Sequence, residues 1–246
     1  MSPTFVHLHL HSEYSLTDST LRIAPLVQRC ADRGLPAVAV TDTSNLFALV
    51  KFYKAAESAG LKPICGADLY LALDNQSAAR VTVLCQNRNG FLSLSRLISR
   101  GFLEGHRGDY VAVQPDWLLS DCDGLIVIAG RESPVGVALA AGRREQAQAW
   151  LQQWQQALPD RLYLELTRTQ RAGESAFNTA ALDLADGLGL PVIASNDVRF
   201  LDRSDFDAHE ARVCIATGRV LDDPKRPREH SPEQYLKSAH EMAELF

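Results

Sequence analysis

Cysteine is scarce in this chain of 246 residues, and its spacing does not suit cross-linking or thiolate metal binding. The five cysteines are single, odd in number and form no C-x-x-C pair: Cys30, Cys65, Cys85, Cys122 and Cys214. Such a distribution favours reduced thiols that act as small apolar side chains, and it argues against a disulfide framework or a zinc-thiolate site.

Long apolar runs and a secretory signal are also missing. No stretch approaches the roughly 20 apolar residues that a helix needs to cross a bilayer. The first residues, MSPTFVHLHLHSEY, lack the basic segment and apolar run of a signal peptide. We therefore expect a cytoplasmic protein with no membrane partner.

Positive charge is in deficit. The chain has 25 lysines and arginines against 30 aspartates and glutamates, a net charge of -5, which argues against wrapping nucleic acid by bulk electrostatics. No G-x-G-x-x-G or G-x-x-x-x-G-K-[ST] motif follows an apolar run, so the usual nucleotide signatures of open sheets are absent. The hydrophobic fraction of 46% is ordinary for a globular domain.

Short apolar runs alternate with segments of helical periodicity. The run PAVAVTD (36–42), for example, precedes the amphipathic segment 45–60, and RLYLELTR (161–168) precedes another at 174–189. This alternation predicts an α/β fold of parallel strands covered by helices. About seven such units fit in roughly 215 residues, fewer than in an eight-unit barrel. A smaller or distorted barrel therefore fits best, and a doubly wound open sheet is the alternative.

The C-terminal part differs in composition. We expect residues 1–217 to form the barrel and residues 218–246 to form a proline-rich linker with short helices. One of these helices would begin at Ser231, with Pro232 in its first position. A last amphipathic pattern is still open at Phe246, so we expect a further domain to follow in nature.

Three of the seven histidines alternate with leucine in FVHLHLHSEY (5–14). On a strand, His7, His9 and His11 would share the face that points into the barrel, and the residues between them would face the helices. Other strand ends carry aspartates: Asp42, Asp68 and Asp197, with Asp18 soon after the histidines. Imidazoles and carboxylates are ligands of zinc, manganese and iron, so the pattern favours a metal site. A single such residue would more commonly be a core histidine or a helix cap.

Arginines occupy the same strand ends. Arg80 opens one strand, Arg131 follows GLIVIAG, and Arg199 lies two residues after Asp197. A guanidinium group is always protonated and cannot bind a metal ion, so these residues indicate ion pairs with the carboxylates.

The blocks around these residues resemble the PHP (polymerase and histidinol phosphatase) domain family. The resemblance covers essentially the whole chain, including FVHLHLHSEYSLTD, LPVIASNDVRFLDRSDFDAHEARVCIATG and LDDPKRPREHSPEQYLKSAHEMAELF, and it is strongest to the N-terminal domains of bacterial replicative DNA polymerases. It implies a distorted seven-stranded (βα) barrel with a short helical C-terminal extension. Active members of the family hold a trinuclear metal centre and hydrolyse phosphoesters.

The resemblance carries over to single positions. Five ligand positions keep a ligand side chain: His9, His11, Asp18, Asp68 and Asp197. Four positions depart from the pattern: Thr43, Arg80, Arg131 and Arg199. We therefore expect a degenerate centre with no catalytic residue and no resident cofactor, or at most a residual zinc or manganese ion. The arginines would balance Asp18, Asp68 and Asp197 in place of metals.

The function implied is that of a non-catalytic domain of a replicative polymerase. The full-length polymerase would use magnesium for template-directed DNA synthesis and would contact DNA. This domain would serve as a scaffold and as a docking site for the proofreading exonuclease subunit, next to other replicase subunits. The alternative is a metal-dependent phosphoesterase or 3′–5′ exonuclease with a partial metal centre. A free-standing metabolic phosphatase fits the C-terminal part poorly.

Overall fold

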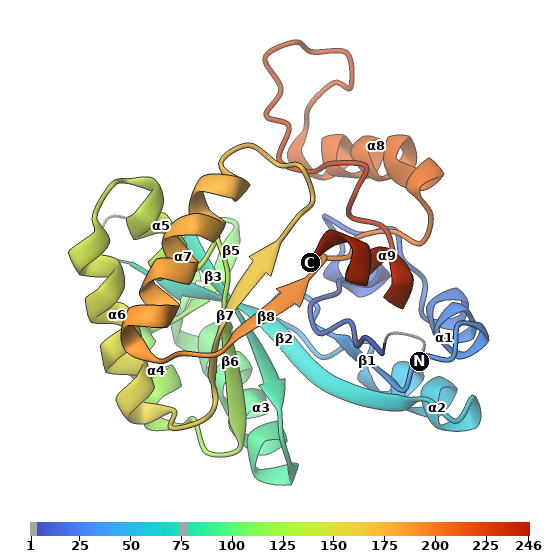
Figure 1. The fold of residues 1–246 in the computed structure, drawn as a ribbon. Coiled ribbons are helices and arrows are strands. Elements are labelled where there is room, and N and C mark those ends of the chain that lie inside the picture. Colours follow the sequence, from blue (N-terminus) through green and yellow to red (C-terminus); the bar gives the residue numbers. More distant parts are fainter. Residues whose placement is uncertain (1–3, 74–77) are drawn as a thin grey trace.

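The structure is a computed structural model that describes residues 4–73 and 78–246. A single mixed sheet crosses the molecule, with helices packed on its outer side (Figure 1). Its strands follow the order β4-β5-β2-β3-β6-β7-β8, and β1 pairs with the first half of β2. The strands are β1 (Ala37–Val40), β2 (Lys62–Ala72), β3 (Ala78–Cys85), β4 (His106–Arg107), β5 (Tyr110–Val113), β6 (Leu125–Ala129), β7 (Leu162–Thr167) and β8 (Val192–Ser195).

The expected α/β architecture is confirmed, but the expectation of uniformly parallel strands is wrong. β3 runs antiparallel to both β2 and β6, and the short β4–β5 pair is also antiparallel. Only five residues, 73–77, separate β2 from β3. Such a connection is too short for the helical crossover that a parallel pair requires, so β3 returns beside β2 in the opposite direction.

The histidine-rich N-terminal segment is not a regular strand. It pairs through isolated bridges, from His7 to Val38 in β1 and from Leu10 to Val198 beyond β8. The His11 amide donates to the Val198 carbonyl at 2.9 Å, and the Ala39 amide donates to the His7 carbonyl at 2.8 Å. This segment therefore joins β1 to the chain after β8 through single bridges.

Because the segment bends, its side chains do not alternate strictly. Leu10 packs in the cluster beneath α1 and α2, as the alternation predicts for an outward residue. Leu8, which the alternation also places outside, instead packs against Leu84 and Ile128 in a separate apolar cluster. A bend without a continuous ladder removes the two-residue period that the prediction assumed.

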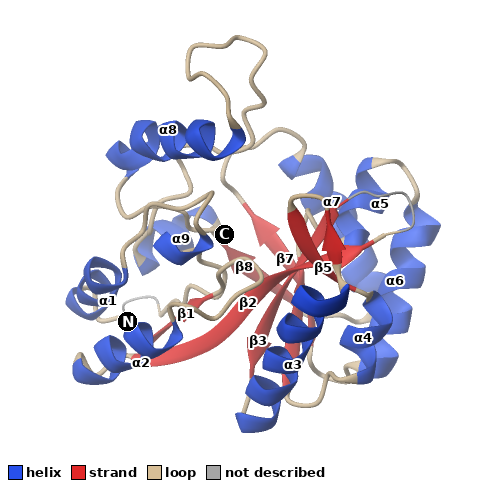
Figure 2. Ribbon diagram, turned by 180° about the vertical axis from the view of Figure 1, so that it is seen from behind, coloured by secondary structure: helices blue, strands red, loops and turns tan. Residues whose placement is uncertain are grey.

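Helices cover the outer side of the sheet in two groups (Figure 2). Helices α3 to α7 bury the larger apolar cluster, centred on Trp154, and α1 and α2 cover a second cluster around Phe52. The helices are α1 (Ile23–Asp32), α2 (Leu49–Ser58), α3 (Arg88–Glu104), α4 (Pro115–Ser120), α5 (Pro134–Ala140), α6 (Arg144–Ala157), α7 (Glu174–Leu188), α8 (Phe206–Thr217) and α9 (Ala239–Leu245). No described helix has the length and apolar character needed to cross a membrane.

The C-terminal part folds back onto the barrel end. Residues 218–230 form a loop that projects beyond α8 (Figure 1). The helix expected from Ser231 is absent. Residues 231–238 form a turn and an extended stretch, with a bridge from Phe200 to Tyr235. The Asn196 side chain donates to the carbonyls of Glu233 and Tyr235 at 2.9 and 2.8 Å, and these bonds hold the backbone extended.

A substitution at Leu236 tests whether the C-terminal part is packed into the core of the fold. Its side chain is fully buried in the cluster beneath α1 and α2. We expect Leu236→Ala to lower the free energy of unfolding by about 2–5 kcal/mol, the usual cost of truncating a buried leucine. Leu221→Ala, at a position 42% exposed in the projecting loop, is the matched control and should change it by less than about 0.5 kcal/mol. Urea denaturation measures both. Equal effects would contradict the packing.

Candidate functional site

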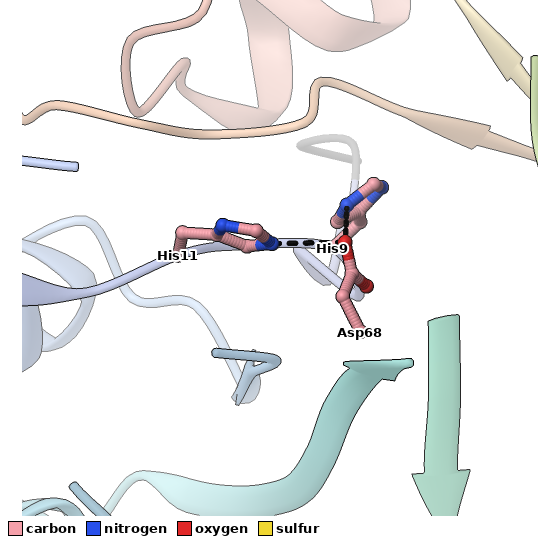
Figure 3. Close-up of side chains that lie close together, drawn as sticks. All are labelled: His9, His11 and Asp68. Atoms are coloured by element: carbon pink, nitrogen blue, oxygen red, sulfur yellow. Dashed lines mark hydrogen bonds and ion pairs between the residues drawn. The ribbon is translucent and has the colours of Figure 1, made fainter. Parts of the chain in front are cut away.

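Three of the expected ligand residues converge at one point (Figure 3). The Nε2 atoms of His9 and His11 lie 3.0 and 2.9 Å from the same oxygen of Asp68, Oδ2. The other oxygen accepts a 2.6 Å hydrogen bond from the hydroxyl of Thr82, which lies directly opposite Asp68 in the β2–β3 ladder. Strand pairing and the bend of the N-terminal segment thus place two imidazoles on one carboxylate.

Carboxylates from two further strands surround His9. Its Nδ1 lies 2.7 Å from Glu165 in β7, and its Nε2 lies 3.3 Å from Asp197 after β8. Asp197 has a φ of +43°, in the left-handed region that non-glycine residues rarely adopt. Its side chain is held there by Gln234, whose amide donates to Oδ2 at 2.9 Å. The C-terminal part therefore helps to place a residue of the site.

The side chains of His9, His11, Asp18, Asp68, Glu165 and Asp197 form a group of contacting residues, called the ligand cluster below. Arg199 lies inside this cluster. Its side chain is fully buried, with Nη1 at 2.5 Å from Asp18 Oδ2 and Nη2 at 2.5 Å from Asp197 Oδ1. It also contacts Nδ1 of His11. The hydroxyl of Thr43 lies 3.4 Å from the same imidazole nitrogen. A guanidinium and a hydroxyl, from two of the positions expected to depart from the ligand pattern, thus occupy the surroundings of His11.

The other two arginines behave differently from each other. Arg80 donates through Nε to Glu132 at 2.9 Å and reaches Asp18 at 3.5 Å, so it joins the ion-pair network. The expected pairing of Arg131 is wrong. Arg131 donates to the carbonyl of Ala172 at 3.1 Å and has no carboxylate partner in the described part of the chain.

Arg171 takes the place that Arg131 was expected to fill. Its Nη1 lies 2.8 Å from Asp197 Oδ2 and 3.5 Å from Glu132. The sequence reading missed Arg171, Glu132, Glu165 and Gln234. Glu165 could have been identified from the sequence, since it is the only charged residue of β7. Arg171 lies in the β7–α7 connection, and no strand-end pattern points to it.

Two residues near the motif have other roles. His7 hydrogen-bonds through Nε2 to the Lys237 carbonyl at 2.8 Å, and burial lowers its pKa to about 4. It therefore contacts the C-terminal part, not the cluster. Asp42 accepts bonds of 2.7 Å from the Ser12 amide and from the hydroxyls of Ser12 and Ser15. Asp42 thus orders the turn after the histidines, as a capping residue would.

The charges of the cluster perturb one another strongly. Burial would lower the pKa of His9, but Asp68, Glu165 and Asp197 raise it well above 6.5. Burial would raise the pKa of Asp18 and Asp197, but Arg199 and the nearby imidazoles hold both well below the usual range. Both carboxyls are therefore ionised, and His9 is protonated at neutral pH.

The balance of charge limits what the cluster can hold. Two imidazoles and three guanidinium groups, those of Arg80, Arg171 and Arg199, face five carboxylates. The five carboxylates are those of Asp18, Asp68, Glu132, Glu165 and Asp197. The ion-paired set, which leaves out Arg131 on the wall of the same cavity, is neutral when both imidazoles are protonated. With neutral imidazoles it has an excess of two negative charges, which one divalent cation would balance.

The donor atoms and the space also fit one ion. One ligand atom each from His9, His11 and Asp68 lie within 4.8 Å of one another. The cavity beside them measures about 20 Å³, enough for a water molecule or a single ion. In the ligand pattern that the family resemblance implies, three metals would require the positions that Arg199, Arg80 and Thr43 occupy. The site therefore fits a mononuclear centre and does not fit a trinuclear one.

Comparison with known proteins places the chain in a family. The model of the PHP domain matches residues 7–169. The chain belongs to the PHP domain family. Outside this range lie the candidate ligand Asp197, the buried Arg199 and the C-terminal part that covers them.

Curated relatives extend the match over nearly the whole chain. This PHP domain is 55% identical to the DNA polymerase III subunit alpha of Xylella fastidiosa over 99% of its length, and 49% identical to that of Pseudomonas fluorescens over 100%. It is 46% identical to that of Escherichia coli K12 over 99%. The chain spans only about a fifth of the length of these relatives, between 21 and 22%.

Solved structures share the fold at low identity. An amidohydrolase from Chromobacterium violaceum superimposes with a TM-score of 0.54 at 15% identity, covering 84% of this PHP domain and 96% of that chain. A Bifidobacterium adolescentis protein described as a metal-dependent phosphoesterase gives 0.51 at 15% identity, covering 79% and 88%. These likenesses support the barrel-like fold alone.

Removal of Arg199 tests the ion-pair network. We expect Arg199→Ala to cost about 3–5 kcal/mol of unfolding free energy, because Asp18 and Asp197 would remain buried without their counter-charge. His9→Ala should cost less, since the adjacent cavity lets water reach the freed carboxylates. Arg131→Ala, an arginine without a carboxylate partner among the described residues, is the matched control and should cost no more than about 1 kcal/mol. Denaturant melts that rank His9→Ala above Arg199→Ala would contradict the network.

Protonation of the imidazoles predicts an unusual pH dependence. The pKa values of His9 and His11 are raised above 6.5 in the folded state. Their stabilisation is therefore complete below pH 6.5 and is lost as the pH rises through the folded-state values. In the window above pH 6.5 we expect the unfolding free energy to fall, by up to about 1.4 kcal/mol per pH unit for each imidazole. His7, whose pKa is lowered, contributes no slope in this window.

Urea melts of the chelator-treated chain measure this slope. The variants His9→Gln and His11→Gln should each remove part of it. His240→Gln, at an exposed imidazole on α9, should leave it unchanged. A flat profile in the parent chain would exclude paired imidazolium groups at the site.

Proposed function

We propose that the chain is the N-terminal domain of the alpha subunit of a bacterial replicative DNA polymerase, and that its barrel end is a buried ion-pair core instead of a hydrolytic centre. The identity of 46–55% to three polymerase alpha subunits over nearly the whole chain supports the first part. The observation that carries the second part is the fully buried Arg199 between Asp18 and Asp197. In this proposal, DNA synthesis in the cytoplasm with magnesium belongs to the full-length polymerase.

The small space at the site supports a non-catalytic role. Hydrolysis of a phosphoester needs room for a phosphoryl group, an attacking water and, in this family, several metals. A cavity of about 20 Å³ lined by Arg80, Arg171 and carboxylates leaves no such room. The guanidinium groups also provide fixed positive charge beside the carboxylates, where a hydrolase would have metal ions. In this proposal the chain retains the candidate ligand residues but has no room for a hydrolytic reaction.

A single divalent ion remains compatible with these residues. His9, His11 and Asp68 would hold it, and zinc or manganese suits their nitrogen and oxygen donors. Bound there, the ion would supply a Lewis-acid charge at the centre of the cluster. Its entry would displace the protons of both imidazoles, so binding would strengthen with rising pH.

For the partner, we propose the proofreading exonuclease subunit of the same replicase. A barrel that has lost its hydrolytic centre can be retained as a scaffold, and the polymerase relatives supply the replicase context. Size-exclusion chromatography of the purified chain with that subunit tests this: co-elution supports docking, and separate elution at micromolar concentrations opposes it.

The second candidate is a metal-dependent phosphoesterase or exonuclease with a partial centre. Only the convergence of His9, His11 and Asp68 favours it. It requires the arginine side chains to move away from the carboxylates so that substrate can enter. The burial of Arg199 makes such movement costly.

Metal titration separates the two candidates. We expect the metal-free chain to bind no more than one zinc ion, with proton release, and to hydrolyse p-nitrophenyl phosphate and single-stranded DNA no faster than buffer. Asp68→Asn should abolish the binding. Asp202→Asn, at a partly exposed ion pair with Arg29, is the matched control and should keep it. Calorimetry and absorbance assays measure the two properties. Metal-dependent turnover that Asp68→Asn removes would establish the phosphoesterase.

A further inference from the structure

A pair of thiols lies at the opposite end of the sheet strands from the ligand cluster. The antiparallel register of β2 and β3 pairs Gly66 with Leu84. One residue further out, the same register places Cys65 of β2 opposite Cys85 of β3. Both thiols are partly exposed. Both line a large apolar groove of about 1060 Å³, which lies between α2 and α3 and contains Tyr53 and Phe91. The proposed polymerase role uses neither thiol.

We propose that Cys65 and Cys85 form an oxidisable dithiol that a peroxide converts into a cross-strand disulfide. Directly opposed residues of an antiparallel pair have Cα atoms about 4.5 or 5.5 Å apart. Disulfides span Cα separations of about 4.4–6.8 Å, so the Cα spacing of either kind of pair lies within this range. The common groove gives a small oxidant access to both sulfur atoms.

The two thiols differ in a way that assigns their roles. A hydrogen bond from the Cys85 thiol lowers the pKa of Cys65, and the same interaction raises the pKa of Cys85. In this proposal Cys65 is the thiol that ionises and attacks first, and Cys85 is the resolving thiol. Once Cys65 is oxidised, its negative charge no longer opposes ionisation of Cys85.

The reaction with hydrogen peroxide balances in two steps. The Cys65 thiolate attacks one peroxide oxygen, the O–O bond breaks, and a sulfenic acid and hydroxide form. The Cys85 sulfur then attacks the sulfenic sulfur, the S–O bond breaks, and the disulfide forms as the second hydroxide leaves. The thiol protons and the two hydroxides give two waters. The two thiols lose two electrons and the peroxide gains them.

Peroxide treatment of the purified chain, followed by alkylation and peptide mass spectrometry, tests the proposal. We expect a peptide linked through Cys65 and Cys85, reversed by dithiothreitol, and loss of the free Cys65 thiol about tenfold faster than that of Cys122. Cys122 is the internal control, because it is equally half-buried and its thiol donates only to backbone carbonyls.

Two variants make the test decisive. Cys85→Ser should leave Cys65 at the sulfenic acid, trapped by dimedone, and Cys65→Ser should slow oxidation of Cys85 to the rate of Cys122. Both replacements are small, and a thermal melt within a few degrees of the parent chain shows that the variants fold. Absence of the linked peptide in the folded parent chain, or equal rates at Cys65 and Cys122, would overturn the proposal.

Discussion

The buried Arg199 guanidinium is the interaction on which the site depends. It joins Asp18, in the loop after the histidines, to Asp197, in the segment after β8. These two parts of the chain also meet through the backbone bond between His11 and Val198. Burying a guanidinium is unfavourable unless carboxylates pair with it. Loss of Arg199 or of either carboxylate would therefore leave a buried charge without a partner. The same pairs hold the N-terminal segment against the chain after β8, which single bridges alone would hold weakly.

This constraint gives the candidate ligand residues a structural role that needs no metal. In a metal centre, carboxylates and imidazoles neutralise metal charge. Here the carboxylates neutralise arginines, and the imidazoles of His9 and His11 are held between Asp68, Glu165 and Asp18. Loss of a carboxylate would leave a buried cation without a partner, which is as unfavourable as loss of the arginine. The acidic residues are therefore required by the ion pairs, whether or not a metal ever binds.

Much of the fold could be predicted because its determinants are local. Apolar runs followed by amphipathic segments indicated β7 with α7 and β1 with α2, and both pairs of elements are present. His9, His11 and Asp68, which the family resemblance implied as ligand positions, also come together. The direction of β3 was missed because parallel strands were assumed, although the five-residue connection from β2 was too short for a crossover.

The rest of the site depends on contacts that a linear reading cannot supply. Arg131 occupies the family position, yet it is Arg171 that reaches Asp197. The path of the β7–α7 connection determines which arginine reaches Asp197. This path cannot be predicted from local sequence propensities. In the same way, the pattern around Ser231 satisfied the rules for a helix start, but the Asn196 side chain holds that backbone extended. A side chain distant in sequence thus overrode a local capping signal.

The contacts of this C-terminal stretch make it part of the site. Gln234 donates to the carboxylate of Asp197, and its carbonyl accepts from the Arg199 amide at 2.8 Å. His7 binds the backbone of Lys237 at 2.8 Å. Residues 231–237 therefore cover the cluster and fix the strained Asp197 that Arg199 and Arg171 both require. A displacement of this stretch would expose the buried ion pairs to water and weaken them, because their strength depends on exclusion from solvent. The stability of the barrel end and the position of the C-terminal part are thus coupled through the same carboxylate.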